Sequence, residues 1–511
     1  MRKSRLGVIG GIAAVLALAC LGLAGCASLP LHVEKPRSEA LQTPAQTTLG
    51  RIVAASSEGR YTSGIRLLSS GDEALASLIA LADHAERTLD IQYYIIAQDE
   101  SARILLQHVR RAAERGVRVR ILVDDLNTAG QDRRLMRLSV RANTEVRVFN
   151  PFPGGRFALW TRFLASASDI PRINHRMHNK LFVADNAVAI TGGRNISDQY
   201  FARDKNSNFI DLDVVAAGPI VPQLSASFDA FWNSRYAYPI ASVAAPVPLE
   251  PAPQWLEERV IPGESDFLAR ELDAGHLQLS WVPATVLADR PVKIGTENSP
   301  DEEDTIAGDI AALLQTANQE VILISPYFIP GREGIALLRT LVRRGVHIRI
   351  LTNSLAASDS PLVHIGYSRY RVELLHLGVE LSEVRPNLGT ARPRFHPFRS
   401  SAASLHAKAI VIDQKTVFIG SLNMDARSAR TNSELGLVIR STEIARQVIG
   451  LLDDISDDGS YKLQLLDHSN QIEWSSGAPG AERFWFKDPE TTFWQRFVLK
   501  LLTPIAPEEF L

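Results

Sequence analysis

A long internal repeat is the feature that most constrains how this chain can fold. A β-branched run before Ile95, an amphipathic stretch ending at Gly116 and a second β-branched run recur before Ile329 and after Gly345. Each copy predicts a strand, a helix and a strand, because glycine commonly ends helices and β-branched runs favour strands. The sequence therefore predicts two homologous α/β domains, each with a mixed or mostly parallel sheet that carries helices on both faces.

A second repeated pattern places one histidine, one lysine and one aspartate at a constant spacing. Its two copies lie 228 residues apart and consist of His178, Lys180 and Asp185, and of His406, Lys408 and Asp413. Along a strand, a histidine and a lysine two residues apart point to the same face. If the halves pack face to face, the two pairs meet in one cleft. Ammonium groups can then neutralise a phosphodiester while one imidazole attacks and the other protonates the leaving alcohol.

The composition argues against some other site chemistries. No group of His, Asp and Glu has a convincing metal-ligand spacing, and paired lysines would repel a divalent cation, so neither a metal nor another cofactor is expected. The formal net charge of −2 does not favour a general nucleic-acid binder. A periplasmic nuclease would also need basic loops, whereas the segments before both motifs are apolar.

The doubled motif resembles the HKD signature of the phospholipase D superfamily. In each copy a glycine-containing segment follows at the same distance and ends in Asn195 or Asn423. The resemblance implies two phospholipase D-like α/β domains packed face to face around a shared active-site cleft, and a phosphohistidine intermediate. It implies that His178 is the nucleophile and His406 the general acid, although the residues alone leave this assignment open. Further implied roles are phosphoryl binding by Lys180, Lys408, Asn195 and Asn423, and anchoring of local turns by Asp185 and Asp413.

Four residues outside the motif complete the predicted site. Asp211 and Glu434 occupy equivalent positions in the two halves, so each is a candidate for holding an imidazole in one tautomer. The alternative is a plain carboxylate at a strand edge. Ser421 stands opposite Gly193 and offers a further hydrogen bond to the phosphoryl group. Arg194 breaks the symmetry of the repeat, either as a head-group contact or as a solvated surface charge.

Whole segments resemble the C-type bacterial cardiolipin synthases, from about residue 75 to the C-terminus. They include residues 176–180, 192–196, 352–357, 363–370 and 404–408. The resemblance implies that a phosphatidyl group passes from phosphatidylethanolamine to phosphatidylglycerol, without a cofactor. A phospholipase D hydrolase would use the same residues with water as the acceptor. A scaffold that only binds lipid would not need two intact motifs, and the sequence identifies no protein partner.

Two kinds of apolar segment fit a lipid substrate. The stretch from Phe152 to Ile173 precedes the first motif and the stretch from Pro393 to Phe398 precedes the second. They either hold acyl chains or pack against the opposite domain. The segment from Phe493 to Leu502 has an apolar face with Arg496 and Lys500 opposite. It either lies on a membrane surface or docks as a helix on its own domain.

The first 26 residues have the layout of an export signal. A basic start is followed by an apolar run that ends at Cys26 in a sequence resembling the bacterial lipobox. An uncleaved membrane anchor is the alternative. Ala27 and Ser28, rather than an aspartate, directly follow Cys26. In this respect the chain resembles lipoproteins that are sorted to the periplasmic face of the outer membrane. The predicted order is a signal over 1–26, a tether over 27–50, an N-terminal domain over 51–240, a connecting segment over 241–296, a C-terminal domain over 297–460 and an extension over 461–511.

Overall fold

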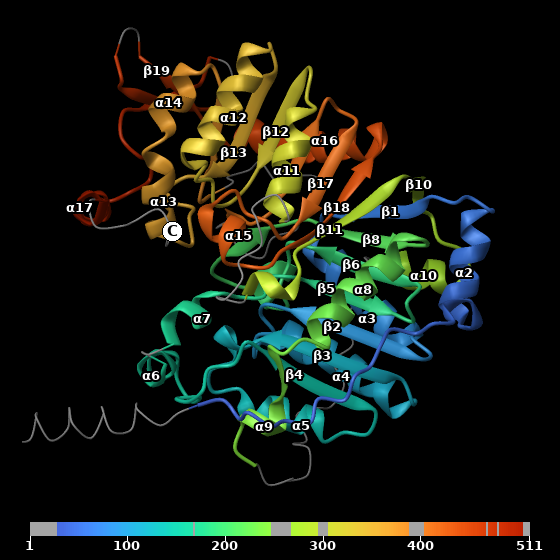
Figure 1. The fold of residues 1–511 in the computed structure, drawn as a ribbon. Helices are drawn as coiled ribbons and strands as arrows, with labels where there is room; N and C mark the ends of the chain where they lie inside the picture. Colours follow the sequence, from blue (N-terminus) through green and yellow to red (C-terminus); the bar gives the residue numbers. More distant parts are fainter. Residues whose placement is uncertain are drawn as a thin grey trace, which may run out of the picture.

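The fold consists of two α/β halves, which lie one above the other in Figure 1. The computed structural model describes residues 28–166, 169–246, 267–294, 305–387, 403–466, 469–477 and 480–503. The predicted signal over residues 1–26, including Cys26, and the apolar stretch from Pro393 to Phe398 lie outside the described residues. In the part of the chain that is described, no helix combines the length and the apolar character needed to cross a membrane.

The N-terminal half is built on a nine-stranded mixed sheet with the order β10-β1-β8-β6-β5-β2-β3-β4-β9. Its strands are β1 (Ser63–Leu68), β2 (Thr88–Tyr93), β3 (Arg118–Asp124), β4 (Thr144–Phe149), β5 (Leu181–Ala184), β6 (Val188–Gly192), β8 (Asp213–Ala217), β9 (Ala237–Pro239) and β10 (Ser280–Val282). Strands β2, β3 and β4 are parallel, and the other pairs are antiparallel. Helix α4 (Glu100–Glu114) makes the crossover from β2 to β3.

The C-terminal half repeats this arrangement on a ten-stranded sheet with the order β11-β18-β17-β16-β12-β13-β14-β19-β20-β21. Its strands are β11 (Ala284–Ala288), β12 (Glu320–Ile324), β13 (His347–Asn353), β14 (Glu380–Val384), β16 (Ala409–Ile412), β17 (Thr416–Gly420), β18 (Leu435–Arg440), β19 (Ser460–Leu465), β20 (Ile472–Ser476) and β21 (Arg483–Trp485). The run β18-β17-β16-β12-β13-β14 matches β8-β6-β5-β2-β3-β4 strand for strand. The predicted duplication is confirmed.

Apolar packing explains why the halves lie face to face. The strands have apolar residues on both surfaces, so each sheet must be covered twice. The outer surfaces are covered by α3 (Gly71–His84) and α4 in the first half and by α11 (Ile306–Gln315) and α12 (Gly331–Arg343) in the second. The inner surfaces share one core, which also takes in α8 (Ile220–Trp232) and α16 (Thr442–Asp458).

The predicted tether is wrong for most of its length, because the chain already packs on the N-terminal half well before residue 50. Arg120 donates a hydrogen bond to the carbonyl oxygen of Ser38 at 2.9 Å. The backbone N–H of Ala40 donates to a carboxylate oxygen of Asp229 at 2.8 Å. Helix α2 (Thr48–Ser57) then begins at a side-chain cap provided by Thr47. Buried charged partners thus hold a segment whose composition predicts a flexible linker.

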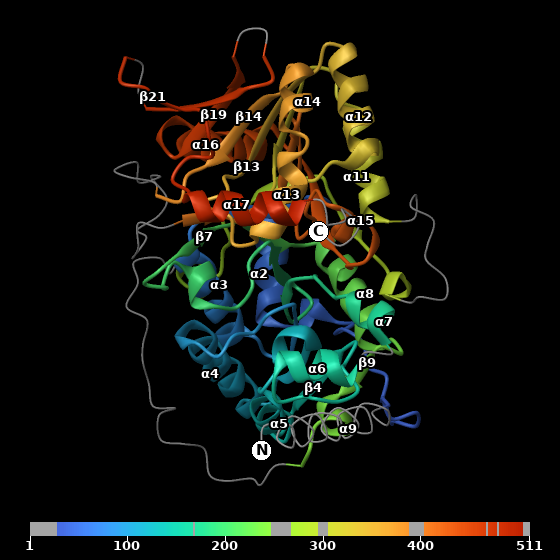
Figure 2. The ribbon, with the colours of Figure 1, turned by 90° about the vertical axis from the view of Figure 1, so that its left-hand side faces the viewer.

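The predicted connecting segment and C-terminal extension also belong to the two halves. Of residues 241–296, the part from 267 onward forms α10 (Phe267–Asp273) and β10, which pack on the first half, and β11, which pairs with β18. The chain therefore passes between the sheets at Pro283, where no linker is needed. Strands β19, β20 and β21 lengthen the second sheet. The last described helix, α17 (Phe493–Leu502), packs against α13 (Pro361–Ser368), as Figure 2 shows.

Candidate active site

Two backbone bridges between the halves position the motif histidines. Strands β7 (Asn208–Ile210) and β15 (Ala403–Leu405) form a parallel pair across the interface, and His406 N donates to the carbonyl oxygen of Ile210 at 2.8 Å. On the other side of the site, His178 N donates to the carbonyl oxygen of Ser433 at 2.9 Å. Each histidine is thus bonded to the residue just before the predicted orienting carboxylate of the other half.

Each imidazole is hydrogen-bonded to a carboxylate from the opposite half. His178 Nδ1 lies 2.9 Å from Glu434 Oε2, and His406 Nδ1 lies 2.6 Å from Asp211 Oδ2. Both carboxylate side chains are fully buried. A carboxylate at Nδ1 holds the proton on that nitrogen and leaves Nε2 as the reactive atom. Neither motif histidine has its carboxylate partner in its own half.

The surroundings of the two Nε2 atoms differ. His406 Nε2 lies 3.3 Å from the hydroxyl of Tyr200 and 3.2 Å from Lys408 Nζ. His178 Nε2 has no hydrogen-bond partner among the described residues, and Tyr94 packs edge-on against the ring with 5.0 Å between centroids. Among the described residues, His178 therefore has the less encumbered reactive nitrogen.

Burial makes both motif lysines unusually acidic. Burial is the main cause that lowers the pKa of Lys180 to about 7 and that of Lys408 to about 8. Burial also lowers the pKa of His178 to about 4, against the opposing charge of Glu434. The charge of Lys408 lowers the pKa values of both His178 and Lys180, so groups from the two halves form one electrostatic cluster.

The two carboxylates are held in the ionised form. Burial opposes the ionisation of Asp211, but the charge and hydrogen bond of His406 outweigh it and lower the pKa of Asp211 to about 2. The pKa of Glu434 is likewise lowered, because His178 and Lys180 outweigh its burial. At neutral pH each imidazole therefore faces a negative charge. Such a cluster can bind an anionic phosphodiester and provide one nucleophile and one acid.

Comparisons with known proteins identify this arrangement. Residues 78–232 and 310–455 match a family model described as "Cardiolipin synthase, PLD-like domain". The chain is 39% identical over 463 residues to cardiolipin synthase C of Escherichia coli, covering 88% of this chain and 96% of that protein. The chain belongs to the phospholipase D superfamily. It is an enzyme of that superfamily, and the family and enzyme class predicted from its motifs are confirmed.

Other relatives agree with this assignment. The chain is 25% identical over 412 residues to cardiolipin synthase 1 of Bacillus anthracis, which covers 80% of this chain and 68% of that protein. Phosphatidylserine synthase from Haemophilus influenzae has the same fold, with a TM-score of 0.56 at 14% identity; the match covers 91% of this chain and all of that one. The phospholipase D-like domain therefore occurs twice, as the repeat predicts.

Within this phospholipase D-like frame, the motif histidines and lysines lie just before strands rather than inside them. Residues 178–180 precede β5, and residues 406–408 lie between β15 and β16. The prediction of strand alternation is therefore wrong in detail. Backbone bridging across the interface, rather than the pleat of one strand, directs these side chains.

The motif aspartates anchor turns. Asp185 accepts hydrogen bonds from the backbone N–H groups of residues 86–88, where β2 begins. Asp413 does the same for residues 318–320, where β12 begins. Both adopt positive φ angles, 51° and 49°, in the tight turn after their strand. Their geometry is that of the predicted anchors and places them away from the reacting nitrogens.

The predicted phosphate ligands have partners of their own. Asn195 accepts from Ile95 N at 3.1 Å and donates to the hydroxyl of Tyr200 at 3.0 Å, so it reaches His406 through that tyrosine. The hydroxyl of Ser421 donates to Glu434 and accepts from a backbone N–H. Ser421 is therefore placed to hold a carboxylate, which differs from the predicted phosphoryl contact. Asn423 Oδ1 is buried without a hydrogen-bond partner among the described residues.

Two asymmetries of the repeat have a structural cause. A Cβ atom at Gly193 would lie 2.1 Å from Asp211 Oδ1, so a side chain does not fit where the second half has Ser421. Arg194 is buried and donates to the backbone carbonyl oxygens of Leu68, Ser69, Tyr200 and Asp211. Both predicted roles for Arg194, a head-group contact and a solvated charge, are wrong.

Several site residues have no signal in the repeat. The ring of Tyr94 and the hydroxyl of Tyr200 contact one histidine each, without an equivalent tyrosine at the matching position of the other half. Asp289 accepts a hydrogen bond from Glu434 N at 2.9 Å and pairs with Lys293 at 2.8 Å. Pairing the two halves of the sequence could not identify residues that occur in only one of them.

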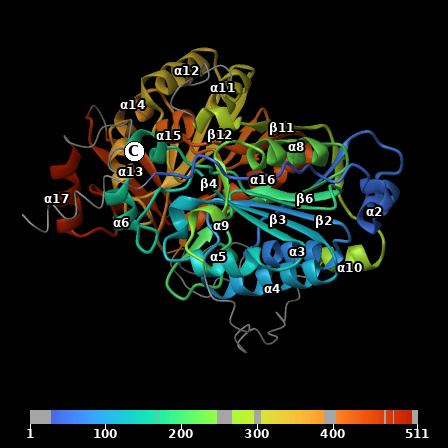
Figure 3. The same cartoon turned by 60° about the horizontal axis from the view of Figure 1, so that its bottom comes forward.

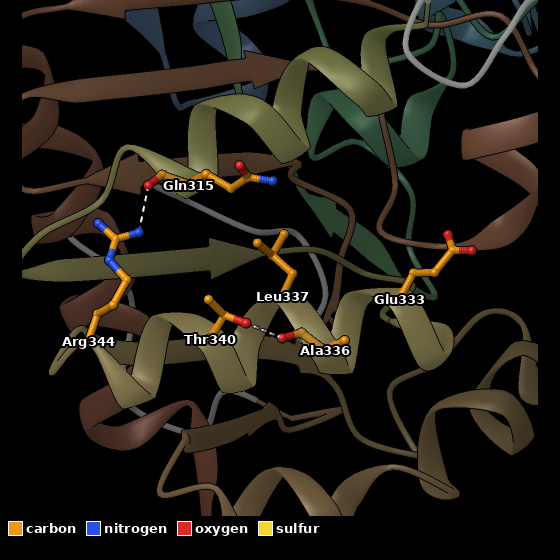
Figure 4. Close-up of a pocket in the computed structure, with 6 residues that line it drawn as sticks. All are labelled: Gln315, Glu333, Ala336, Leu337, Thr340 and Arg344. Carbon is orange, nitrogen blue, oxygen red and sulfur yellow. Dashed lines mark hydrogen bonds between the residues drawn. The ribbon is translucent and has the colours of Figure 1, made fainter.

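The described residues offer no metal site, and the cavity drawn in Figure 4 lies away from the motif histidines. This part of the chain contains no group of three or more His, Cys, Asp or Glu side chains placed to hold a metal ion. An open depression of about 550 Å³ lies between α11 and α12, lined by Gln315, Glu333, Ala336, Leu337, Thr340 and Arg344 (Figure 4). Its arginine already donates to the carbonyl oxygen of Gln315 at 2.7 Å. It is a surface feature of the second half.

Proposed function

We propose that the site transfers a phosphatidyl group from one phospholipid to the hydroxyl of another, as in a cardiolipin synthase. The observation that carries this proposal is the pair of imidazoles, each held by a buried carboxylate of the other half, with a lysine two residues further along the chain. The similarity to cardiolipin synthases supports the same reaction.

The first half-reaction breaks the donor's bond to its head group. His178 Nε2 attacks the phosphorus, a nitrogen–phosphorus bond forms, and the bond to the head-group oxygen breaks. Protonated His406 donates its Nε2 proton to that oxygen, and the neutral alcohol leaves. Lys180 and Lys408 neutralise the phosphoryl oxygens, which bear more charge in the transition state. The amide nitrogen of Asn423 would donate to the same oxygens, since its Oδ1 can only accept a hydrogen bond.

The second half-reaction restores the enzyme. The hydroxyl of an acceptor lipid gives its proton to His406, and its oxygen attacks the phosphorus. The nitrogen–phosphorus bond breaks, so His178 returns to its neutral form with the electron pair on Nε2. Asp211 stabilises the imidazolium that forms at His406 in this step, because it is ionised and bonded to Nδ1.

Purified full-length protein with mixed phosphatidylethanolamine and phosphatidylglycerol vesicles tests this reaction. We expect cardiolipin and free ethanolamine, resolved by mass. When a His406→Ala variant is given a donor with a p-nitrophenol leaving group, which departs without a general acid, rapid acid-free quenching should find a phosphatidyl group on the peptide that contains His178. Phosphatidic acid as the sole product would replace transfer by hydrolysis, and no turnover of either lipid would contradict the proposal.

We further propose that the chain is an exported bacterial lipoprotein, acylated at Cys26 and held at the periplasmic face of the outer membrane. The layout of residues 1–26 supports this location. Labelled palmitate should enter the wild-type protein and not a Cys26→Ala variant, and density fractionation should place the wild type with outer-membrane markers. Labelling of the variant, or recovery with the inner membrane, would contradict the proposal.

A further inference from the structure

Helix α6 (Leu159–Ala165) and helix α17 carry the same exposed apolar pattern although they belong to different halves. Large apolar side chains occur at positions i, i+1, i+4 and i+5 of both helices, which places them on one helical face. They are Leu159, Trp160, Phe163 and Leu164 in α6, and Phe493, Trp494, Phe497 and Val498 in α17. All eight are exposed, with Trp160 at 65% and Trp494 at 69%.

The opposite face of α6 already has its partners. Arg162 is fully buried, donates to the carbonyl oxygen of Asp125 and lies 3.1 Å from the hydroxyl of Thr128. The neighbouring Thr161 donates to the carbonyl oxygen of Gly155 at 2.6 Å. These bonds orient the helix with its tryptophan and phenylalanine outward. The exposed face is therefore not a surface that α6 would bury by settling on its own half.

Helix α17 is held in a comparable way. It begins with a capping box between Thr492 and Gln495, and Arg369 donates to the carbonyl oxygen of Thr503 at 2.5 Å. None of its residues is buried. Arg496 and Lys500 lie along one edge of its apolar stripe, three and seven residues after Phe493. The helix therefore presents aromatic side chains bordered by positive charge, which is the composition of helices that lie in a bilayer interface.

The two helices face the same side of the molecule. Figures 1, 2 and 3 agree that α6 and α17 project from one side, α6 from the N-terminal half and α17 from the C-terminal half. Most of the large apolar side chains that are exposed in the described residues belong to these helices or to the residues beside them. A pattern contributed by two separate domains to one side is not the scattered exposure expected of a soluble surface.

Both helices are also next to the site. Helix α6 is followed by α7 (Ile170–Asn174), which leads directly to the segment of His178. Helix α17 packs on α13, which begins two residues after Asp359; burial lowers the pKa of His406, and the charge of Asp359 partly opposes that shift. Arg427 donates to Asn174 at 2.9 Å and so ties α7 to the second half. The apolar side of the molecule is therefore the side from which the catalytic segments are supported.

We propose that α6 and α17 together form a docking surface for a phospholipid bilayer. The proposal rests on the proposed function in one respect: a transferase that joins two membrane lipids needs its site held at the membrane. Trp160, Trp494 and their neighbours enter the head-group region, and Arg496 and Lys500 contact lipid phosphates. Two separated contacts, one per half, fix the tilt of the molecule so that donor and acceptor lipids reach the site from one leaflet.

Quenching by lipids brominated on their acyl chains tests insertion of these tryptophans directly. The readout is independent of any lipid anchor at the N-terminus, because it reports the depth of the indole rings. With the full-length protein on vesicles of phosphatidylethanolamine and phosphatidylglycerol, we expect brominated lipid to quench part of the emission of the seven tryptophans. A Trp160→Phe/Trp494→Phe variant should lose most of that quenchable fraction. An unchanged quenchable fraction would overturn the proposal.

Activity measurements separate docking from chemistry. A Trp160→Glu/Trp494→Glu variant should lose about tenfold or more of its turnover on vesicles, since two apolar contacts become charged. Its turnover of short-chain phospholipids dispersed as monomers should stay within about twofold of wild type. The control is Phe267→Glu, which changes a 55% exposed aromatic and should change neither rate, because its helix α10 lies on the opposite side of the molecule from α6 and α17 (Figure 3).

Two further outcomes distinguish the alternatives. Equal losses on vesicles and on monomeric lipid would assign these helices to the site and overturn the docking role. A second copy of the chain would cover this face if the wild type were a dimer and the glutamate variant a monomer. In that case the quenchable fraction on vesicles would be the same in the wild type and in the Trp160→Phe/Trp494→Phe variant, and the docking role would be overturned. If the wild type formed no cardiolipin but still showed the quenching, the proposed function would fail while the docking surface stood.

Discussion

At the scale of single residues, the chemistry depends on two carboxylates, each of which is hydrogen-bonded to the histidine of the opposite half. Glu434 reaches His178, and Asp211 reaches His406, at Nδ1 distances of 2.9 and 2.6 Å. A neutral amide could accept the same hydrogen bond but would not stabilise an imidazolium. The buried negative charge is therefore the property to remove in a test of orientation.

The change Glu434→Gln should lower kcat by about 10³-fold or more, because the replaced group holds the tautomer and the charge that the imidazole needs. The KM for vesicles should change little, since Glu434 is buried and does not contact lipid. Steady-state cardiolipin formation measures both. Glu473→Gln, on the remote strand β20, is the matched control. A kcat within a factor of three of wild type would contradict the orienting role.

The pH dependence of kcat/KM should be bell-shaped, because the nucleophile must be neutral while the general acid His406 and the two lysines must be protonated. The pKa of His178 is about 4, so the neutral imidazole accumulates, and the rate rises, as pH increases through that value. On the alkaline side the rate falls first as His406 loses its proton, because burial lowers the pKa of His406 below its usual value. It falls further as Lys180 and Lys408 lose theirs, because their pKa values are about 7 and 8. Lys180→Arg should remove the part of the alkaline fall that lies near pH 7 in monomeric-lipid assays. An alkaline limb that neither Lys180→Arg nor Lys408→Arg moves would contradict this origin.

The reacting residues could be predicted from the sequence, while several supporting residues could not. Position in the repeat is enough to find His178 and Glu434, since equivalent residues must occupy equivalent places. It fails for Arg194, whose four carbonyl partners come from three separate segments. It also fails for Ser421, which bonds a carboxylate that is longer than its counterpart Asp211. Hydrogen-bond partners depend on tertiary contacts that no local pattern encodes.

At the scale of secondary-structure elements, the two turns that follow the motif strands do a structural task. Asp185 and Asp413 each bond three successive backbone N–H groups and so attach the turn to the start of the neighbouring strand. The environments differ: one of the N–H groups bonded by Asp185, that of Thr88, is buried, whereas those of Asn318 and Gln319 are exposed. An unsatisfied donor costs more where water cannot replace the partner.

Asp185→Ala should therefore cost about 2–3 kcal/mol of unfolding free energy, and Asp413→Ala should cost less, about 1 kcal/mol. Urea unfolding followed by circular dichroism measures both. The folded fraction of each variant should keep its kcat within about threefold, since neither carboxylate contacts a reacting nitrogen. A kcat lowered as strongly as in the Glu434→Gln variant would instead place the aspartates in the chemistry.

Elements at the ends of the domains were the hardest to predict. Strand-helix-strand units are visible because their periodicity is local, and the parallel β2-β3-β4 and β12-β13-β14 runs are as expected. Composition predicts a tether before residue 50 and an extension after residue 460. Both are parts of the halves, because hydrogen bonds to charged side chains hold the first segment and pairing with a sheet edge holds the second. An edge strand carries little signal of its own, since its pairing depends on a distant partner.

At the scale of the whole molecule, the halves should unfold as one unit. A single apolar core contains residues from both sheets and from α8 and α16, so neither half can bury its inner face alone. The cross-bonded histidines add a second link, because separating the halves leaves the buried carboxylates Asp211 and Glu434 without their partners. Loss of the interface therefore exposes apolar area and at the same time leaves buried charges without their partners.

Urea titration should consequently show one transition in which activity, circular dichroism and hydrogen-exchange protection of both halves are lost at the same midpoint. Peptides from β2 and β12 report the two sheets separately, since each strand is central in its own sheet. Ile322→Asp would place a charge in the shared core and should lower the midpoint for both peptides equally. Ile348→Asp, in the outer core of the second half, is the stricter test. It should also lower the unfolding midpoint of the β2 peptide, although the substitution lies in the other half. If β12 lost protection while β2 and its half stayed folded, the halves would be independent domains. Asp211 and Glu434 would then connect two domains that are each stable alone.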